Sequence, residues 1–398
     1  MRTSFPIVMM CLATCASAAP YHANLDTALA AFEQSPRALF VGDSLTLRDG
    51  SFFAPLRASI QTRLGNAGSG WQSFSVWTGC GFDPGWTRGI INEDTPPHRS
   101  LDGLWAETSG TPWARIDPES GTKTMRLIVN GSGSFNVWNT MTNQTTPHTA
   151  PAIVTVTFPA QAGRVWIQPN GSGPVVLLGA QCDNGQPGAT LQRAANGGWG
   201  VSNFMQRDAT FEQAVGVVDP RLVWITLGQN DTPDYAPGEY VGAMRALVQR
   251  VRAAAPNAGV VLCSSYDSGS PDIARLADEV YSAAITEGVG YVNLWAAGGP
   301  YSHFVSSGYL DDAVHHNAAG GQYVAAILDA AIRTHGASLR WCAGDANQSG
   351  VTDGADLSLV LANFGGSVPP YTSGDLNGSG VVNNADLSVL LNNFGCAR

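Results

Sequence analysis

The sequence predicts an α/β fold with a mostly parallel sheet, interrupted by an all-β insertion and followed by a small repeat domain. Three observations predict it. Apolar runs alternate with helical patterns over residues 19–70 and 186–336, the stretch between them is rich in Gly, Thr, Ser, Pro and Trp, and a pattern beginning at Gly344 recurs 30 residues later. Strands that alternate with helices favour a parallel sheet covered on both faces.

Residues 1–18 have the features of a secretory signal peptide. Arg2 supplies the positive end, an apolar stretch follows, and Ala16-Ser17-Ala18 forms a small-residue cleavage site. A lipid anchor at Cys15 is disfavoured by the preceding Thr14. The apolar stretch is too short to span a bilayer, and no later segment reaches the required length. We therefore expect a secreted protein without a membrane span.

The charge of the chain excludes some classes of partner. A net charge of -10 with 13% charged residues argues against nucleic acid, whose binding needs a basic face. It also argues against anionic membranes. Five cysteines follow the leader, and export permits disulfides. We expect Cys342 and Cys396 to close the last domain, consider a Cys80–Cys182 pair, and interpret Cys263 as a buried small hydrophobe, although sequence does not determine connectivity.

The α/β elements are predicted in order. Residues 19–70 contain a strand at Ala38–Val41, a turn at Gly42–Ser44 and a helix at about Ala54–Leu64. Further strands are expected at Ala189–Leu191, Leu222–Leu227, Val260–Cys263 and Tyr291–Leu294. Helices are expected at Val201–Phe211, from Pro237 onward with Pro256 beyond its end, and at about Gly321–His335.

Residues 71–185 are predicted to be an inserted, sandwich-like β domain. Alternating runs such as Ile153–Phe158, and turn signals such as Asn130-Gly131, are typical of antiparallel strands. Seven of the eleven tryptophans fall in this region, which suggests a carbohydrate-binding role, although most tryptophans in β domains belong to the core. Residues 337–343 are interpreted as a linker and 344–398 as the repeat domain.

Three distant segments carry the parts of an acyl-transfer site. Ser44 follows the first strand, Asn230 follows another, and Asp312 and His315 lie on a late loop. Ligands of open α/β sheets bind at the carboxyl ends of the strands. Ser44 would attack an ester carbonyl after losing its proton to His315, and Asp312 would hold the other ring nitrogen. Each motif alone could be a capped turn or an ordinary loop residue.

Some assignments stay open at this stage. Asp311 or His316 could fill the roles of Asp312 and His315. The tetrahedral oxyanion would be stabilised by the amide of Asn230 and by the backbone amides of Ser44 and Gly198, with Gly200 as the rival of Gly198.

These blocks resemble those of SGNH (GDSL-type) hydrolases. Ser44 in Gly-Asp-Ser-Leu, Gly198, Asn230 in Gly-Gln-Asn-Asp and Asp312-x-x-His315 match the Ser, Gly, Asn and His blocks, with His316 where the family often has Pro. The resemblance covers 19–70 and 186–336. It implies a flavodoxin-like three-layer α/β/α fold. The position of the insertion is similar to that in peptidoglycan O-acetylesterase-type members, which carry a β domain resembling a carbohydrate-binding module.

Each C-terminal repeat offers oxygen ligands at positions 1, 3, 5, 7, 9 and 12 of an EF-hand-type loop, with Gly at position 6. The predicted calcium ligands of the first copy are Asp345, Asn347, Ser349, Val351, Asp353 and Asp356. Those of the second copy are Asp375, Asn377, Ser379, Val381, Asn383 and Asp386. The pattern resembles a type I dockerin, which implies structural Ca²⁺ and a cohesin-bearing scaffold or cell-surface partner. A repeat that folds without a partner is the alternative.

Together these observations predict a secreted serine esterase that deacetylates a polysaccharide through a Ser44 acyl-enzyme, with no cofactor for catalysis. A lipase, a general carboxylesterase or an acyltransferase are the enzymatic alternatives. A non-catalytic glycan-binding adaptor, tethered by the repeats, is the alternative of another class; the complete set of nucleophile, base and oxyanion donors argues against it.

Overall fold

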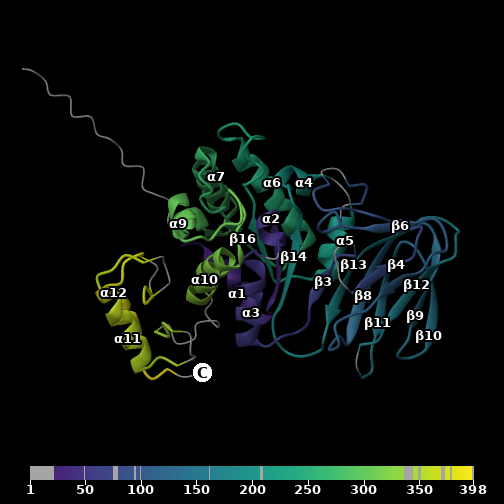
Figure 1. The fold of residues 1–398 in the computed structure, drawn as a ribbon, viewed down its shortest axis with the longest axis horizontal. Helices are drawn as coiled ribbons and strands as arrows, with labels where there is room; N and C mark the ends of the chain where they lie inside the picture. The colour runs from purple at the N-terminus through teal and green to yellow at the C-terminus, as the bar shows by residue number, and fades with distance from the viewer. Residues whose placement is uncertain are drawn as a thin grey trace, which may run out of the picture.

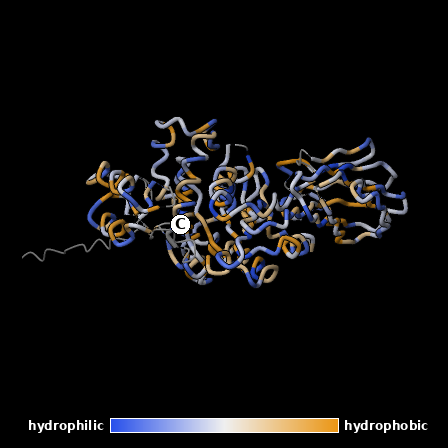
Figure 2. Tube along the Cα trace, turned by 90° about the horizontal axis from the view of Figure 1, so that it is seen from below, coloured by the Kyte–Doolittle hydropathy of each residue, from blue (hydrophilic) through white to orange (hydrophobic). Residues whose placement is uncertain are grey.

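A computed structural model describes residues 22–48, 50–74, 79–93, 96–98, 100–160, 162–206, 209–335, 344–347, 351–368, 373–376 and 379–396. The molecule is elongated, with a central α/β unit between a β-rich end and the C-terminal repeats (Figures 1 and 2). Within these ranges, no helix is both long and apolar enough to cross a membrane.

A six-stranded sheet with the order β1-β17-β16-β15-β2-β14 forms the centre of the α/β unit. Five strands run parallel to one another, and β1 (His22–Ala23) is antiparallel to β17. The parallel strands are β2 (Arg37–Gly42), β14 (Thr190–Ala195), β15 (Leu222–Thr226), β16 (Gly259–Cys263) and β17 (Gly290–Val292). The order reverses at β2, which pairs with both β14 and β15. This is the flavodoxin-like arrangement, in which ligands bind at the switch point.

Helices cover both faces of the sheet (Figure 1). Alternate residues of β2 point to opposite sides: Ala38 and Phe40 join one apolar core, and Leu39 and Val41 the other. The first core contains residues of α1 (Leu25–Gln34), α3 (Phe53–Leu64), α8 (Leu294–Ala297), α9 (Tyr301–Ser306) and α10 (Ala318–His335). The second contains residues of α4 (Val201–Met205), α5 (Ala209–Val218), α6 (Glu239–Ala254) and α7 (Pro271–Glu287). The three-layer α/β/α arrangement therefore agrees with the sequence prediction.

Several element boundaries in the structure differ from the predicted ones. The helix expected over Val201–Phe211 is two helices, α4 and α5. The helix expected from Pro237 begins at Glu239, because Gly238 has a left-handed backbone with φ 88°. The strand expected to end at Leu294 stops at Val292, since the side chain of Asn293 accepts a hydrogen bond from Ala296 N and caps α8.

Two antiparallel sheets occupy the chain between α3 and β14. One has the order β10-β9-β12-β7-β4, the other β11-β8-β13-β6-β5, and β3 also pairs with β13. Their bounds are β3 (Gly70–Gln72), β4 (Cys80–Phe82), β5 (Thr87–Arg88), β6 (Ala106–Thr108), β7 (Ala114–Ile116), β8 (Thr124–Gly131), β9 (Ser134–Asn139), β10 (Gln144–Thr149), β11 (Ala152–Thr157), β12 (Val165–Pro169) and β13 (Val175–Asp183).

The β13 strand joins the β region to the α/β unit. Leu177 and Cys182 pack between the two antiparallel sheets, whereas Val176 and Leu178 belong to the same core as Leu39 of the parallel sheet. The β region and the α/β unit thus share one continuous core. Cys80 on β4 and Cys182 on β13 both border the core between the two antiparallel sheets, but both are free thiols, so the considered pair is not formed in this structure. Cys263 is buried and free, as expected.

The C-terminal repeats contain two short helices, α11 (Gly354–Ala362) and α12 (Asn384–Asn392). They pack around a small core of Val360, Val382 and Leu390. The side chains of Asp353 and Asn383 cap the two helices by accepting hydrogen bonds from the amides two residues on. Cys396 is disulfide-bonded, and its expected partner Cys342 lies outside the described residues.

Candidate active site

The Gly-Asp-Ser turn places Ser44 at the switch point of the sheet. Ser44 is the first residue of α2 (Ser44–Leu47), directly after β2, and the Asp43 carboxylate caps this helix by accepting from Leu45 N at 2.8 Å. Position 42 must be glycine, because a Cβ there would lie 2.1 Å from Thr46 Oγ1. The local sequence therefore fixes a tight strand-to-helix turn with the serine at its apex.

The structure brings Ser44, His315 and Asp312 into one hydrogen-bonded chain. Ser44 Oγ lies 2.9 Å from His315 Nε2, across 271 residues of sequence. On the other side of the ring, His315 Nδ1 lies 2.8 Å from Asp312 Oδ2. This is the geometry in which an imidazole can take a proton from a hydroxyl while a carboxylate fixes its tautomer.

Asp312 is held in its ionised form by the loop that carries it. Its Oδ1 accepts hydrogen bonds from the backbone amides of His315 at 2.7 Å and Val314 at 2.8 Å. These amides, together with the His315 ring, hold the pKa of Asp312 well below its usual range. Arg48 Nη1 lies 3.4 Å from Oδ2. The loop itself is anchored by the Tyr266 hydroxyl, which donates to the Val314 carbonyl.

The neighbours Asp311 and His316 do not fill these roles. His316 is 4% exposed, and its ring packs on Tyr266 with 4.4 Å between the ring centroids. Burial, followed by the charge of His315, lowers the pKa of His316 to about 4. Asp311 meets His315 through the backbone, since its amide donates to the His315 carbonyl at 2.8 Å.

Gly198 and Asn230 line the same cleft as Ser44 and His315, whereas Gly200 does not. Gly198 has φ 75°, a conformation that favours glycine. The Gly200 amide is engaged by Asn203 Oδ1 at 2.9 Å in the cap of α4, and a Cβ at Gly200 would lie 2.4 Å from Asp231 Oδ1. Gly200 is therefore required for packing, and its amide is not available as an oxyanion donor. The Asn230 amide donates to the Trp199 carbonyl at 3.0 Å.

Comparison with known proteins agrees with this geometry. Residues 166–323 match the GDSL-like Lipase/Acylhydrolase family. This range contains Gly198, Asn230, Asp312 and His315, and Ser44 precedes it. The α/β unit contains a GDSL-type hydrolase domain. The prediction of a carboxylic ester hydrolase is confirmed at the level of this family.

Solved structures support the fold. A structure titled "Peptidoglycan O-acetylesterase in action, 5 min" is 16% identical, with a TM-score of 0.63, over 77% of this chain and 94% of that one. A Bacillus subtilis protein is 15% identical over 63% and 88%, with a TM-score of 0.34. The salicylyl-acyltransferase SsfX3 of a tetracycline biosynthetic pathway is 13% identical over 65% and 95%, with a TM-score of 0.31. Only the first is close enough to show a shared fold. No curated protein matches the sequence.

Two further carboxylates lie beneath the site of the GDSL-type domain. Asp231 is fully buried, accepts from Val201 N at 2.8 Å and from the Tyr240 hydroxyl at 3.2 Å, and so fixes the start of α4. Burial raises the pKa of Asp231 to about 6, and burial with the nearby Asp231 charge raises that of Asp43 to about 7. Asp43 and Asp231 belong to the Gly-Asp-Ser-Leu and Gly-Gln-Asn-Asp motifs, but the sequence did not predict their structural roles.

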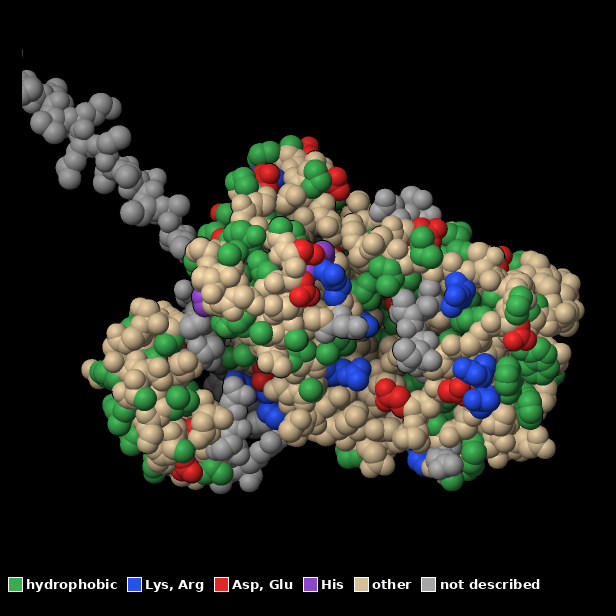
Figure 3. Space-filling view, viewed as in Figure 1, with side chains coloured by type: hydrophobic (Ala, Val, Ile, Leu, Met, Phe, Trp, Pro, Cys, Tyr) green, Lys and Arg blue, Asp and Glu red, His purple; other side chains and the backbone are tan. Residues whose placement is uncertain are grey.

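The cleft of the GDSL-type domain has a volume of about 1000 Å³. Figure 3 shows histidine, acidic and basic side chains gathered on this face of the α/β unit. Sequence reasoning missed several of its lining residues, among them Ile91 and Asn92 from the β region and Arg193 from β14. Asn92 N donates to Asn196 Oδ1 at 2.8 Å, which fixes this β-region loop against the segment that carries Gly198. No local pattern marks such a contact.

The repeat loops hold the residues predicted to bind calcium. Four of the predicted ligands are buried carboxylates, with exposed fractions of 8%, 0%, 1% and 0% for Asp345, Asp356, Asp375 and Asp386 respectively. Asp356 and Asp386 accept hydrogen bonds from backbone amides of their own loops. Among the described residues, no group of three or more His, Cys, Asp or Glu side chains is placed to hold a metal. Ser349 and Asn377 lie outside the described residues.

The buried His316 predicts a pH-dependent stability. A histidine with a folded pKa of about 4 binds a proton in the unfolded chain before it does so in the folded one. Its contribution to folding is therefore complete above the unfolded pKa of about 6.5 and is lost as the pH falls towards 4. In a His316→Phe variant, the free energy of unfolding should fall less than in the wild type over this range, by roughly 3 kcal/mol.

Urea unfolding at pH 7 and pH 4.5 would measure this difference. The comparison between variant and wild type is needed because Asp43 and Asp231, whose pKa values are raised, change stability in the opposite sense. An identical pH dependence in both proteins would contradict the assignment.

Proposed function

We propose that the protein is a secreted serine esterase that removes acetyl groups from a polysaccharide. The observation that carries this proposal is the chain from Ser44 Oγ through the His315 ring to the ionised Asp312. It stands at the switch point of the sheet, in an open cleft. His315 and Asp312 belong to the range that matches the GDSL-like family.

The first half of the reaction forms an acyl-enzyme. Ser44 Oγ attacks the ester carbonyl while its proton passes to His315 Nε2. The tetrahedral intermediate collapses, the carbon–oxygen bond to the sugar breaks, and His315 returns the proton to the departing sugar oxygen. Asp312 stabilises the imidazolium in between through its bond to Nδ1.

The second half releases the acid. Water attacks the acyl carbonyl, gives one proton to His315 Nε2, and displaces Ser44 Oγ, which recovers that proton. In both halves the oxyanion would accept hydrogen bonds from the Asn230 side-chain amide and from the backbone amides of Ser44 and Gly198. Asn230 uses one amide hydrogen on the Trp199 carbonyl and keeps its second for the oxyanion.

The polysaccharide substrate is supported by the shape of the site. The cleft is open and has a volume of about 1000 Å³, which suits a polymer, and its wall includes Ile91 and Asn92 of the β region. The likeness to a structure titled as a peptidoglycan O-acetylesterase points to the same class of substrate. Half-buried Trp138 and Trp166 are cross-strand neighbours on the β9–β12 pair, a surface suited to stacking on sugars. A lipase, a general carboxylesterase or an acyltransferase remains the enzymatic alternative.

We propose that the C-terminal repeats bind calcium through the predicted loop ligands. The buried carboxylates at positions 1 and 12 of both loops are a donor set that suits a hard cation. The repeats would tether the enzyme to a cohesin-bearing scaffold or a cell-surface partner. Exposed apolar side chains at equivalent positions in the two copies support such a contact, namely Leu361, Phe364, Leu391 and Phe394.

Ser44→Ala should abolish both labelling by a fluorophosphonate and acetate release from acetylated polysaccharides. The substitution removes Ser44 Oγ, the only oxygen within hydrogen-bond distance of His315 Nε2 among the described residues. Acetylated xylan, pectin, chitin-type glycan and peptidoglycan would serve as substrates. A folded wild-type protein that never labels would instead favour the non-catalytic glycan-binding adaptor.

Asn230→Ala should lower kcat on 4-nitrophenyl acetate by about 10²–10³ with little change in KM, because an oxyanion donor acts mainly in the transition state. Asn136→Ala, on the outer face of the β region, is the matched control and should keep wild-type rates. A loss confined to KM would remove Asn230 from the oxyanion site.

The second calcium loop should bind more weakly than the first. Copy one carries three carboxylates among its predicted ligands and copy two carries two, because Asn383 stands where copy one has Asp353. Calorimetry would measure calcium binding to two full-length variants. Asp375→Ala leaves only the loop of copy one intact, and Asp345→Ala leaves only the loop of copy two intact. Equal or tighter calcium binding by copy two would refute the ranking.

A further inference from the structure

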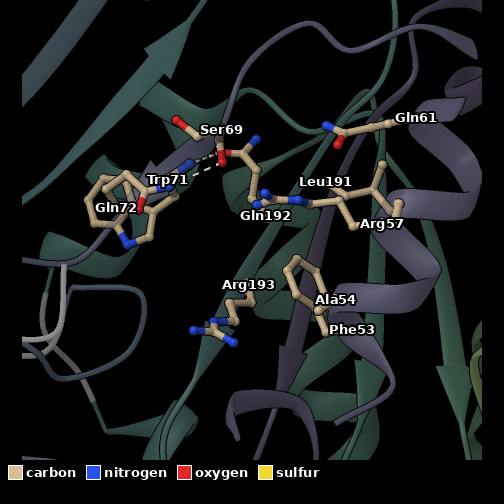
Figure 4. A pocket seen from close by; sticks show the side chains of 11 residues that line it. Phe53, Ala54, Arg57, Gln61, Ser69, Trp71, Gln72, Leu191, Gln192 and Arg193 are labelled. Atoms are coloured by element: carbon tan, nitrogen blue, oxygen red, sulfur yellow. Dashed lines mark hydrogen bonds between the residues drawn. The ribbon is translucent and has the colours of Figure 1, made fainter. Parts of the chain in front are cut away.

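A second cavity, of about 360 Å³, lies beside the catalytic cleft. It is formed where α3, the start of β3 and β14 meet, and we call it the Arg57 cavity (Figure 4). Its lining residues are Phe53, Ala54, Arg57, Ala58, Gln61, Ser69, Trp71, Gln72, Leu191, Gln192 and Arg193. No acidic side chain is among them.

The wall of the Arg57 cavity holds two polar groups that lack partners. Ser69 Oγ and Gln192 Nε2 belong to residues that are 4% and 1% exposed, and neither atom has a hydrogen-bond partner among the described residues. The orientation of the Gln192 amide is set, because its Oε1 accepts from Trp71 N at 2.7 Å. Buried donors without partners cost free energy, which a ligand with acceptor oxygens would recover.

Arg57 adds a positive charge to these donors. Its guanidinium extends from α3 across the cavity towards Gln192 (Figure 4). Arg57 forms no ion pair and no hydrogen bond with another described residue, unlike Arg63 six residues further along the same helix, which pairs with Asp329. A planar guanidinium beside neutral donors is the arrangement that recognises a carboxylate through two parallel hydrogen bonds.

Arg193 connects the Arg57 cavity with the catalytic cleft. It lines both, and its Nη1 donates to the Leu47 carbonyl at 2.7 Å, on the short helix that begins with Ser44. A polymer held at Ser44 can therefore continue past Arg193 into the neighbouring cavity. Because the chain as a whole carries a net charge of -10, attraction of an anion here is a local property of these arginines.

We propose that the Arg57 cavity binds the carboxylate of an acidic sugar residue in the same polymer whose ester is cleaved at Ser44. Arg57 forms the ion pair, and Ser69 and Gln192 provide neutral donors beside it. This inference rests on the proposed function and narrows its substrate class to glycans that carry carboxylates.

Acetate release from partially acetylated polygalacturonate would test the proposal. The same polymer with methyl-esterified carboxylates is the neutral counterpart. Arg57→Gln should lower kcat/KM on the free-acid polymer by about tenfold, as expected for one charge-assisted hydrogen bond, and leave 4-nitrophenyl acetate hydrolysis unchanged. The wild type should show the same loss on the methylated polymer, where Arg57→Gln adds no further loss.

Arg252→Gln, on the distant α6, is the matched control and should behave as the wild type on every substrate. Ser69→Ala, which removes only a hydroxyl, should produce a smaller loss on the free-acid polymer alone. Equal rates of Arg57→Gln and wild type on that polymer, or an equal loss on all substrates, would overturn the proposal.

Binding measured without turnover separates this proposal from the esterase function. Calorimetry would titrate trigalacturonate into Ser44→Ala and into the Ser44→Ala/Arg57→Gln double variant. If Arg57→Gln weakens binding about tenfold, the carboxylate site in the Arg57 cavity is supported. This holds even if no polymer releases acetate and the esterase proposal fails. Absence of binding, or binding that Arg57→Gln does not change, refutes the cavity. Sodium acetate, added as a competitor, tests whether the site instead binds the acetate product. If acetate displaces trigalacturonate at an equal concentration, the assignment to the polymer carboxylate is refuted.

Discussion

The position of β2 in the sheet is the constraint on which the site depends. Because β2 pairs in parallel with both β14 and β15, the chain must leave its carboxyl end where the strand order reverses. Gly42 allows the tight turn there, and Asp43 caps the short helix that carries Ser44. The segment after β15 brings Asn230 to the same edge, and the loop before α10 brings His315 within 2.9 Å of the serine. Each of these side chains is thus held in place by its own turn or loop.

The elements that sequence reasoning placed well are those with a local cause. Most of the parallel strands are buried apolar runs, whereas β14 carries Gln192 and Arg193. Ser44 and Asn230 follow such apolar runs, and Asp312 and His315 stand on a late loop. The choice between His315 and His316 could not be made from sequence, because it depends on the ring of Tyr266, which buries His316. The choice between Gly198 and Gly200 likewise depends on the Asn203 side chain.

Other features were out of reach for a different reason. Ile91, Asn92 and Arg193 come to the cleft through contacts between segments that are distant in sequence, and nothing in their own neighbourhood marks them. The division of Val201–Phe211 into two helices goes with a tertiary contact, because Arg250 of α6 donates to the Phe204 and Gln206 carbonyls at the end of α4. The alternating character of β13 was equally hidden, because one of its faces packs between the two antiparallel sheets and the other joins the core of the parallel sheet.

The anchoring of residues 91–93 has a consequence for how such an enzyme diversifies. Asn92 N donates to the Asn196 side chain, and the Trp199 ring nitrogen donates to the Glu93 carbonyl at 2.9 Å, so both attachment points lie beside the segment that carries Gly198. Substitutions of the Ile91 and Asn92 side chains would reshape this wall of the cleft, while the backbone stays attached at both points. The shape of the cleft wall can therefore change by substitution without moving the contacts that join Ser44, His315 and Asp312.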